Sequence, residues 1–495
     1  MIQTTQKSDP AQNIDECVFS RLSKFGVQPT PICSDEVFLR RAYLDAIGTL
    51  PTAEEARAFL ADKSPDKRTK LIDRLLEREE YADYWSMKWA DLLRVKSEFP
   101  INLWPLAANV YHQWIRTAVK ENWPYTRFAR QLLTSSGSNF RNPPVNFYRA
   151  VPYKQPDSIA RAVALTFMGV RAEKWPKAKL QTFAAFFAKV GYKATGEWKE
   201  EIVFFDPMKK PPVGLASQPQ FPDGSTPTIP RDRDPRLAVA DWLIAPSNPW
   251  FTANIANRVW AWLMGRGIVH EPDDFRPDNP PSNPQLLAAL QEALIDAKYD
   301  VKALIRQIMN SRVYQLDSKP VEARAAANFA AYPLRRLEAE VLIDAINAIT
   351  DTTESYMSAA PEPYTFIPER QRSIALADGS ITSPFLQLFG RPPRDTGLAS
   401  ERNNKPSSGQ RLHLLNSSHI RTKIEQGGKI GVMVRMANST EEIANELYLS
   451  ILSRYPTADE LDTVKAYFEQ APSKRDAAFD LAWAAMNSVE FLYKH

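Results

Sequence analysis

The chain has 495 residues, of which 44% are hydrophobic and 24% charged. This is the composition of a folded globular protein, and it excludes a chain that is disordered throughout. The 62 basic and 58 acidic residues give a net charge of +4 and are interspersed along the sequence, so no basic patch predicts binding of nucleic acid.

The first 13 residues are polar, and no apolar segment near them has the length of a signal peptide or a membrane span. The sequence as given therefore predicts no signal peptide and no transmembrane segment, and a leader removed before Met1 stays an open alternative. Cys17 and Cys33 are its only cysteines. Two thiols cannot form a disulfide framework or a four-cysteine zinc site, which leaves a single bridge or, more commonly, two free thiols.

Apolar residues recur at helical spacing through most of the first 190 residues. Thr52, with Glu55 three residues later, has the pattern of a capping box and predicts the start of a helix. Residues 81–94 are apolar around a broad surface, which predicts a buried helix. The expected helices lie at 14–25, 38–47, 52–60, 65–76, 81–94, 111–121, 127–133, 158–168 and 182–190.

The pattern changes after Trp198. Residues 202–206 form a short apolar run that predicts a strand, and the pair Asp223-Gly224 predicts a tight turn before a returning strand at 226–229. Prolines crowd the sequence from Pro207 to Pro235, which is typical of a linker. We therefore expect a small β-hairpin within a proline-rich connection.

Helical spacing then returns, and the length of the chain favours two or three compact units. The sequence predicts a mainly α protein with two helical domains joined by a proline-rich linker that holds a small β-hairpin. The expected boundaries are 1–197, 198–233 and 234–495. The helices expected in the second domain are 237–244, 252–264, 284–297, 301–311 and 337–349, and residues 351–383 are expected to form a loop.

One pattern occurs twice in the chain. The stretch from Tyr43 to Glu55 resembles the stretch from Tyr448 to Glu460, because each has a Tyr-Leu pair followed by Pro-Thr-Ala and two acidic residues. Two copies so far apart indicate pseudo-symmetry or convergent capping rather than a solenoid.

Several longer motifs are specific enough to suggest a family. They are Phe38-Leu39-Arg40-Arg41, Trp85-x3-Trp89-Ala90-Asp91 and Asn122-x-Pro124-Tyr125 in the first half, and Asp234-Pro235-Arg236, Asn257-Arg258-Val259-Trp260, Gly265-Arg266-Gly267 and His413-Leu414-Leu415-Asn416 in the second. The first set resembles the planctomycete cytochrome-like domain (DUF1549), and the second resembles its usual companion (DUF1553). Members are typically exported and have no established general reaction, so the resemblance implies a periplasmic or cell-surface location.

Members of this family often carry a haem-attachment motif, Cys-x-x-Cys-His, directly after a Gly-Val-Arg segment. Here Gly169-Val170-Arg171 is followed by Ala172-Glu173, and no cysteine occurs after Cys33. Covalent attachment of a c-type haem needs both thiols and the adjacent histidine. We therefore expect a haem-less branch of the family and no cofactor.

The densest group of polar residues lies between 391 and 419. Glu401, Arg402, His413 and Asp395 are the candidate catalytic residues, because carboxylates beside an imidazole can transfer protons at neutral pH. Arg391, Arg394 and Asn416 are candidate ligand-binding residues. The alternative is that the arginine and glutamate side chains pin an irregular loop while the histidine is a satisfied helix residue.

A second group combines Arg258, Trp260, Asp273 and Asp274. Aromatic faces next to carboxylates can bind a cation or sugar hydroxyls. Adjacent aspartates without a glycine-spaced calcium loop are a weak metal signal, and one of them can simply cap a turn, so no metal site is predicted.

The sequence thus leaves three hypotheses for the function. The leading one is a non-redox binding or assembly protein in an extracytoplasmic complex, with a protein or a glycan as partner. The alternative is an enzyme acting on carbohydrate through the Glu401, Arg402 and His413 group. The third is non-covalent binding of haem or a metal through His270, His413 or His419.

Overall fold

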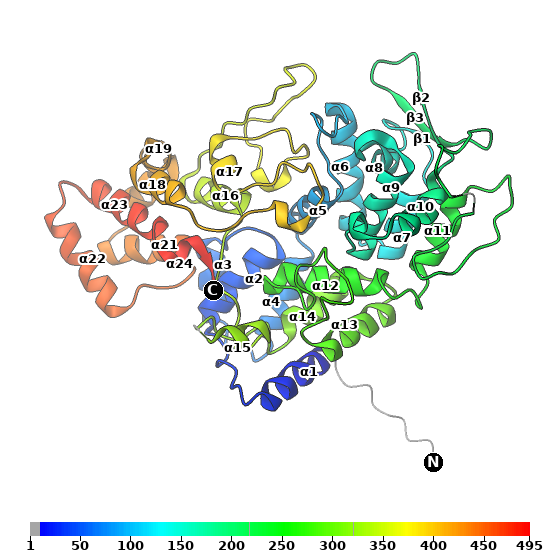
Figure 1. The fold of residues 1–495 in the computed structure, drawn as a ribbon. Coiled ribbons are helices and arrows are strands. Elements are labelled where there is room, and N and C mark those ends of the chain that lie inside the picture. Colours follow the sequence, from blue (N-terminus) through cyan, green and yellow to red (C-terminus); the bar gives the residue numbers. More distant parts are fainter. Residues whose placement is uncertain (1–9, 217, 320) are drawn as a thin grey trace.

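A computed structural model describes residues 10–495 except 217 and 320. The fold is mainly helical, as predicted, with two small antiparallel sheets (Figure 1). Within the described residues, no helix is both long enough and apolar enough to cross a membrane. Cys17 and Cys33 are both free thiols.

The helices of the first half begin and end close to the predicted positions. Ser34 and Thr52 cap their helices through side-chain oxygens, and the predicted capping box of Thr52 and Glu55 is confirmed. The helices are α1 Pro10–Lys24, α2 Asp35–Ala46, α3 Ala53–Ala61, α4 Lys67–Leu76, α5 Glu79–Leu92, α6 Pro105–Lys120, α7 Tyr125–Thr134, α8 Asn146–Arg149, α9 Pro156–Val163 and α10 Lys177–Ala184, with short turns η1 Pro143–Val145, η2 Pro152–Lys154, η4 Ala172–Lys174 and η5 Ala185–Phe187, and a π-helical turn η3 Ala164–Met168.

The small hairpin exists, but its position differs from the prediction. Strand β3 (Glu201–Phe205) pairs with β2 (Val190–Ala194) on one side and with β1 (Gly137–Ser138) on the other. Residues 226–229 form no strand, so the predicted returning strand is wrong. The partner precedes β3 because the sharp turn falls at 195–200. Strand β2 therefore lies before the predicted boundary at 198, and its first residue, Val190, is the last residue of the predicted helix 182–190.

The second half is also a succession of capped helices, and residues 351–383 form the predicted irregular segment apart from one short turn. Its helices are α11 Pro235–Ile244, α12 Phe251–Met264, α13 Pro284–Asp296, α14 Val301–Asn310, α15 Ala323–Ala327, α16 Ala339–Thr350, α17 Pro384–Leu388, α18 Ser408–Asn416, α19 Ser418–Gln426, α20 Gly428–Met436, α21 Thr440–Leu452, α22 Ala458–Gln470, α23 Lys474–Met486 and α24 Val489–Leu492, with turns η6 Ser373–Ala375 and η7 Ala399–Glu401 and the paired strands β4 Arg335–Arg336 and β5 Tyr493–Lys494.

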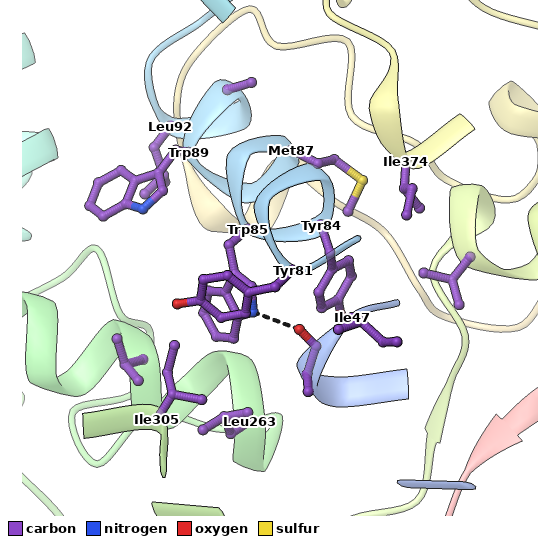
Figure 2. Close-up of a cluster of buried hydrophobic side chains, with 14 of the residues drawn as sticks. Ile47, Tyr81, Tyr84, Trp85, Met87, Trp89, Leu92, Leu263, Ile305 and Ile374 are labelled. Carbon is purple, nitrogen blue, oxygen red and sulfur yellow. Dashed lines mark hydrogen bonds between the residues drawn. The ribbon is translucent and has the colours of Figure 1, made fainter. Parts of the chain in front are cut away.

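Helix α5 lies at the centre of the molecule and is buried almost all round (Figure 2). Trp85 contacts Trp262 of α12 edge-on and donates a hydrogen bond from its indole N–H to the carbonyl of Ala46 at the end of α2. Figure 2 also shows Ile305 of α14 and Ile374 of η6 around the same helix. The two halves of the sequence therefore share one continuous hydrophobic core.

The C-terminal part of the chain is also tied into this core. Arg40 of α2 donates hydrogen bonds to the carbonyls of Ile451 and Phe491, and Arg41 donates to those of Tyr314 and Leu316. In the next turn of α2, the buried Asp45 accepts hydrogen bonds from Lys494, Tyr314 and Tyr332. Three polar residues of α2 therefore fasten this helix to the second half of the chain.

The repeated sequence pattern has matching structures. Thr457 and Glu460 form a capping box at α22 like that of Thr52 and Glu55 at α3. Each copy also has an arginine that lies over the tyrosine of its pattern and pairs with two glutamates. Arg78 lies over Tyr43 and pairs with Glu55 and Glu80, whereas Arg454 lies over Tyr448 and pairs with Glu460 and Glu490.

Candidate functional site

The loop between α17 and α18 carries the predicted catalytic and ligand-binding arginines, and most of them point into the protein. Arg402 forms ion pairs with Asp91 of α5 at 2.8 Å and with Glu340 of α16 at 2.7 Å. Arg394 reaches the other oxygen of Asp91 at 2.9 Å, and Arg391 lies 3.4 Å from Glu340. Three arginines and two carboxylates thus form one buried cluster, which we call the arginine cluster.

The charges of the arginine cluster stabilise one another. Burial alone would raise the pKa of Asp91, but the charges of Arg402 and Arg394 outweigh it and hold the pKa below its usual value. The charge of Arg402 is stabilised in the same way. Burial alone would lower its pKa, but the charges of Glu340 and Asp91 outweigh burial and raise the pKa above its usual value. Burial, followed by the nearby Arg394, lowers the pKa of Arg391 to about 10. Arg391 and Arg402 therefore remain charged at neutral pH.

Asp395 and Glu401 lie at the outer edge of the same loop. Asp395 pairs with Lys96 at 2.6 Å. Glu401 accepts hydrogen bonds from the backbone N–H groups of Asp395 and Thr396 and from the Thr396 hydroxyl. Both carboxylates therefore have partners that fix the loop.

His413 lies in a different environment. It is half-buried in α18, its Nε2 is 3.3 Å from Nδ1 of His419, and its ring packs edge-on against Phe385. His419 in turn contacts Glu354 at 3.0 Å. Burial and the nearby His419 lower the pKa of His413. Asn416 is exposed at the end of the same helix.

The structure thus brings Asp395, Glu401 and Arg402 together in one loop and places His413 apart from them. Within the described residues, His413 has no hydrogen bond or ion pair with any of these three. Their shared catalytic role stays a prediction. In these positions the side chains already have protein partners, which supports the alternative that the loop is pinned in place.

The second predicted group also connects the two halves. The ion pair of Arg258 in α12 with Asp273 measures 2.7 Å and is fully buried, and Asp273 accepts a hydrogen bond from the N–H of Ala399. Arg258 also donates to the carbonyl of Leu165, at the end of the α9–η3 helix, where a positive charge is favourable. Trp260 is completely buried and packs edge-on against Phe329.

Gly169 ends that helix in the left-handed region, with φ +65°. Its carbonyl accepts a hydrogen bond from the N–H of Phe275 at 2.9 Å. A Cβ at this position would lie 2.7 Å from Oδ1 of Asn254 and 2.9 Å from the carbonyl oxygen of Pro272. The absence of a side chain therefore lets the segment after η3 lie directly against the loop 272–275.

An open cavity of about 580 Å³ lies where these two segments meet. One wall is formed by the segment that contains Arg171, Lys174, Trp175 and Lys179, and another by the residues around Trp250 just before α12. Loop residues 274–278 complete it, including Asp274 from the predicted ligand-binding set. The volume is in the range of small-molecule binding sites.

The cavity combines apolar rings with charged groups. Trp175, Trp250 and Phe275 are half-buried in its walls. Asp274 pairs with Lys174 and with Arg276, each at 3.1 Å, so its carboxylate is neutralised by protein groups. This arrangement suits a ligand that has both a flat apolar face and polar substituents.

Comparison with known families agrees with the motifs. Residues 13–189 match the family described as "Protein of unknown function (DUF1549)", and residues 235–468 match that described as "Protein of unknown function (DUF1553)". The chain belongs to the DUF1549–DUF1553 family. No curated protein and no solved structure matches it. The finer domain boundaries of this DUF1549–DUF1553 protein stay a prediction.

Val170 and Arg171, which line the cavity, belong to the segment where the sequence predicts that a haem-attachment motif is missing. The residues of this DUF1549–DUF1553 protein do not fit a covalently attached haem. The described side chains that line the cavity include no thiol and no imidazole, and the two cysteines lie far away in sequence, one in α1 and one just before α2.

Sequence reasoning missed most of the cavity. Arg171 was interpreted only as part of the place of a missing motif, and Trp175 and Lys179 were assigned no role. Trp250 and Phe275 lie 75 and 100 residues beyond Trp175 and carry no local signal that places them beside it. Asp91 was named in a family motif, but its pairing with the arginines was not predicted, and Glu340 was missed, for the same reason.

Proposed function

We propose that this protein is a non-redox binding protein that acts in an extracytoplasmic complex and takes up its ligand in the cavity between residues 171–179 and 274–278. The observation that carries the proposal is the cavity itself, which has three aromatic residues in its walls and lies at the junction of the two family regions. The family resemblance supports the location. The protein partners of Asp395, Glu401 and Arg402 support a structural role for their loop rather than catalysis there.

Tryptophan fluorescence tests the proposal, because Trp175 and Trp250 line the cavity. Neutral and acidic oligosaccharides and aromatic carboxylates are titrated into the protein. We expect at least one class to give a saturable change that is lost in Trp175→Leu. The matched control is Trp198→Leu, which alters a tryptophan that is 60% exposed and does not line the cavity. Absence of saturable binding by every class, or equal binding by the Trp175 variant, would overturn the proposal.

The same mixtures test the enzymatic alternative. The oligosaccharides are incubated with the protein and analysed by mass spectrometry for shortened products. We expect none. Products that disappear in both Glu401→Gln and His413→Gln would favour the carbohydrate-acting enzyme instead.

A further inference from the structure

The cavity has two cationic groups that the protein itself does not neutralise. Its basic residues are Arg171, Lys174, Lys179 and Arg276. Lys174 and Arg276 pair with Asp274, and Arg276 also pairs with Asp278 at 3.0 Å. No carboxylate of the described chain forms an ion pair with Arg171 or Lys179. Both lining carboxylates are thus occupied, while two positive charges remain for a ligand.

Arg171 is one of the two cationic groups without an ion-pair partner in the described part of the chain, and its surroundings indicate which chemical group it can bind. Its Nε is buried and has no hydrogen-bond partner among the described residues. A buried guanidinium N–H without an acceptor is costly, and an acceptor from a ligand would remove that cost. Arginine binds carboxylate or sulfate groups in a planar, often bidentate geometry. Arg171 is therefore suited to hold an anionic group of a ligand.

Lys179 connects this charge to an aromatic surface. Its ammonium group lies over the ring of Trp175, 4.8 Å from the ring centroid. A ligand ring that packs against Trp175 would therefore bring its substituents close to this lysine. Saccharide rings and aromatic rings both have faces that stack on tryptophan.

Resting on the proposed function, we infer that the ligand of the cavity is a ring compound with an anionic substituent, a carboxylate or a sulfate. An acidic saccharide and an aromatic carboxylate share this chemistry. A neutral sugar offers hydroxyl oxygens as acceptors but no negative charge to pair with Arg171 and Lys179.

Isothermal titration with matched probes tests the inference. The probes are an oligogalacturonide trimer, its methyl ester and 4-hydroxybenzoate, because the ester keeps the sugar rings and removes the charge. We expect an anionic probe to bind about tenfold more tightly than the neutral ester, which corresponds to one charge-assisted hydrogen bond. Preference for the trimer identifies a saccharide ligand, and preference for the benzoate identifies an aromatic one.

Variants locate the effect in the cavity. Arg171→Gln and Lys179→Gln are each expected to weaken binding of the anionic probe about tenfold and to leave binding of the ester unchanged. Lys177→Gln is the matched control, because this lysine is exposed and does not line the cavity. Lys179 is on the rim, so its variant remains informative if Arg171→Gln fails to fold. If neither the trimer nor 4-hydroxybenzoate binds more tightly than the ester, the inference is overturned but the proposed function is kept. Failure of all three probes to bind would overturn the inference, and the wider titration with Trp175→Leu would still decide the proposed function.

Discussion

Asp91 and Arg402 lie 2.8 Å apart although 311 residues separate them along the chain. Asp91 belongs to the central helix α5, and Arg402 follows η7 in the second half. Because Arg394 binds the same carboxylate, a single side chain of the first half holds two arginines of the second. Of the two buried carboxylates that hold the loop from 391 to 402, Asp91 therefore binds Arg394 and Arg402, and Glu340 shares Arg402.

We predict that Asp91→Asn lowers the free energy of unfolding by about 3–5 kcal/mol, because two buried guanidinium groups lose their common counter-ion. Denaturant titration at neutral pH measures the loss. The matched control is Asp395→Asn, whose carboxylate is 32% exposed and pairs with Lys96 alone. Its expected cost is about 1 kcal/mol or less. If both variants lose a similar free energy of unfolding, Asp91 contributes no more to stability than a partly exposed ion pair, and the prediction is wrong.

Alanine at position 169 is predicted to lower the free energy of unfolding more than alanine at position 26, although both glycines have φ +65°. A Cβ at Gly26 meets nothing within 4 Å, whereas one at Gly169 meets Asn254 and the backbone of Pro272. Gly26→Ala should cost about 1–2 kcal/mol from the left-handed backbone alone. Gly169→Ala should cost about 1–3 kcal/mol more from overpacking.

Thermal and denaturant unfolding of the two glycine variants test this difference. Gly169→Ala should also weaken any binding in the cavity, since it displaces the segment that carries Arg171. A Gly169→Ala protein as stable as Gly26→Ala would mean that loop 272–275 moves aside freely.

His112 is predicted to make stability depend on pH. It is buried in α6, and neither ring nitrogen has a partner among the described residues. Burial, followed by the charges of Arg394 and Arg116, lowers its pKa from 6.5 to about 3. Between these values the unfolded chain binds a proton that the folded chain does not. The contribution of neutral His112 is therefore complete above pH 6.5 and is lost as the pH falls towards 3.

The variant His112→Phe tests this relationship, because phenylalanine is neutral at every pH. Between pH 6 and 4, the free energy of unfolding of the wild type should fall more steeply than that of the variant, by about 1.4 kcal/mol per pH unit. Urea titrations at several pH values measure both slopes. Parallel slopes would show that His112 is protonated inside the folded protein.

What the sequence could predict depends on how local the cause is. The N-terminal starts of α3 and α22 were predictable, because a threonine cap and its glutamate lie within one turn of each other. Strand β2 was not, because its residues become a strand only through pairing with β3. The pairs of Arg402 with Asp91 and of Arg258 with Leu165 join segments 311 and 93 residues apart, and nothing local specifies them. The polar residues themselves were found, but their partners were not.

The two threonine caps give a last prediction, about the repeated pattern. Thr52→Ala and Thr457→Ala should each lower the free energy of unfolding by about 1 kcal/mol, since each removes the acceptor for one backbone N–H at a helix start. The matched control is Thr463→Ala in the middle of α22, where alanine has the higher helix propensity and the expected change is about zero or slightly favourable. Equal losses of unfolding free energy at the two caps would fit two copies of one structural unit. Each threonine would then stabilise a helix start beside an arginine that lies over a tyrosine and pairs with two glutamates. A loss at only one cap would instead indicate that the second box is a coincidence of sequence.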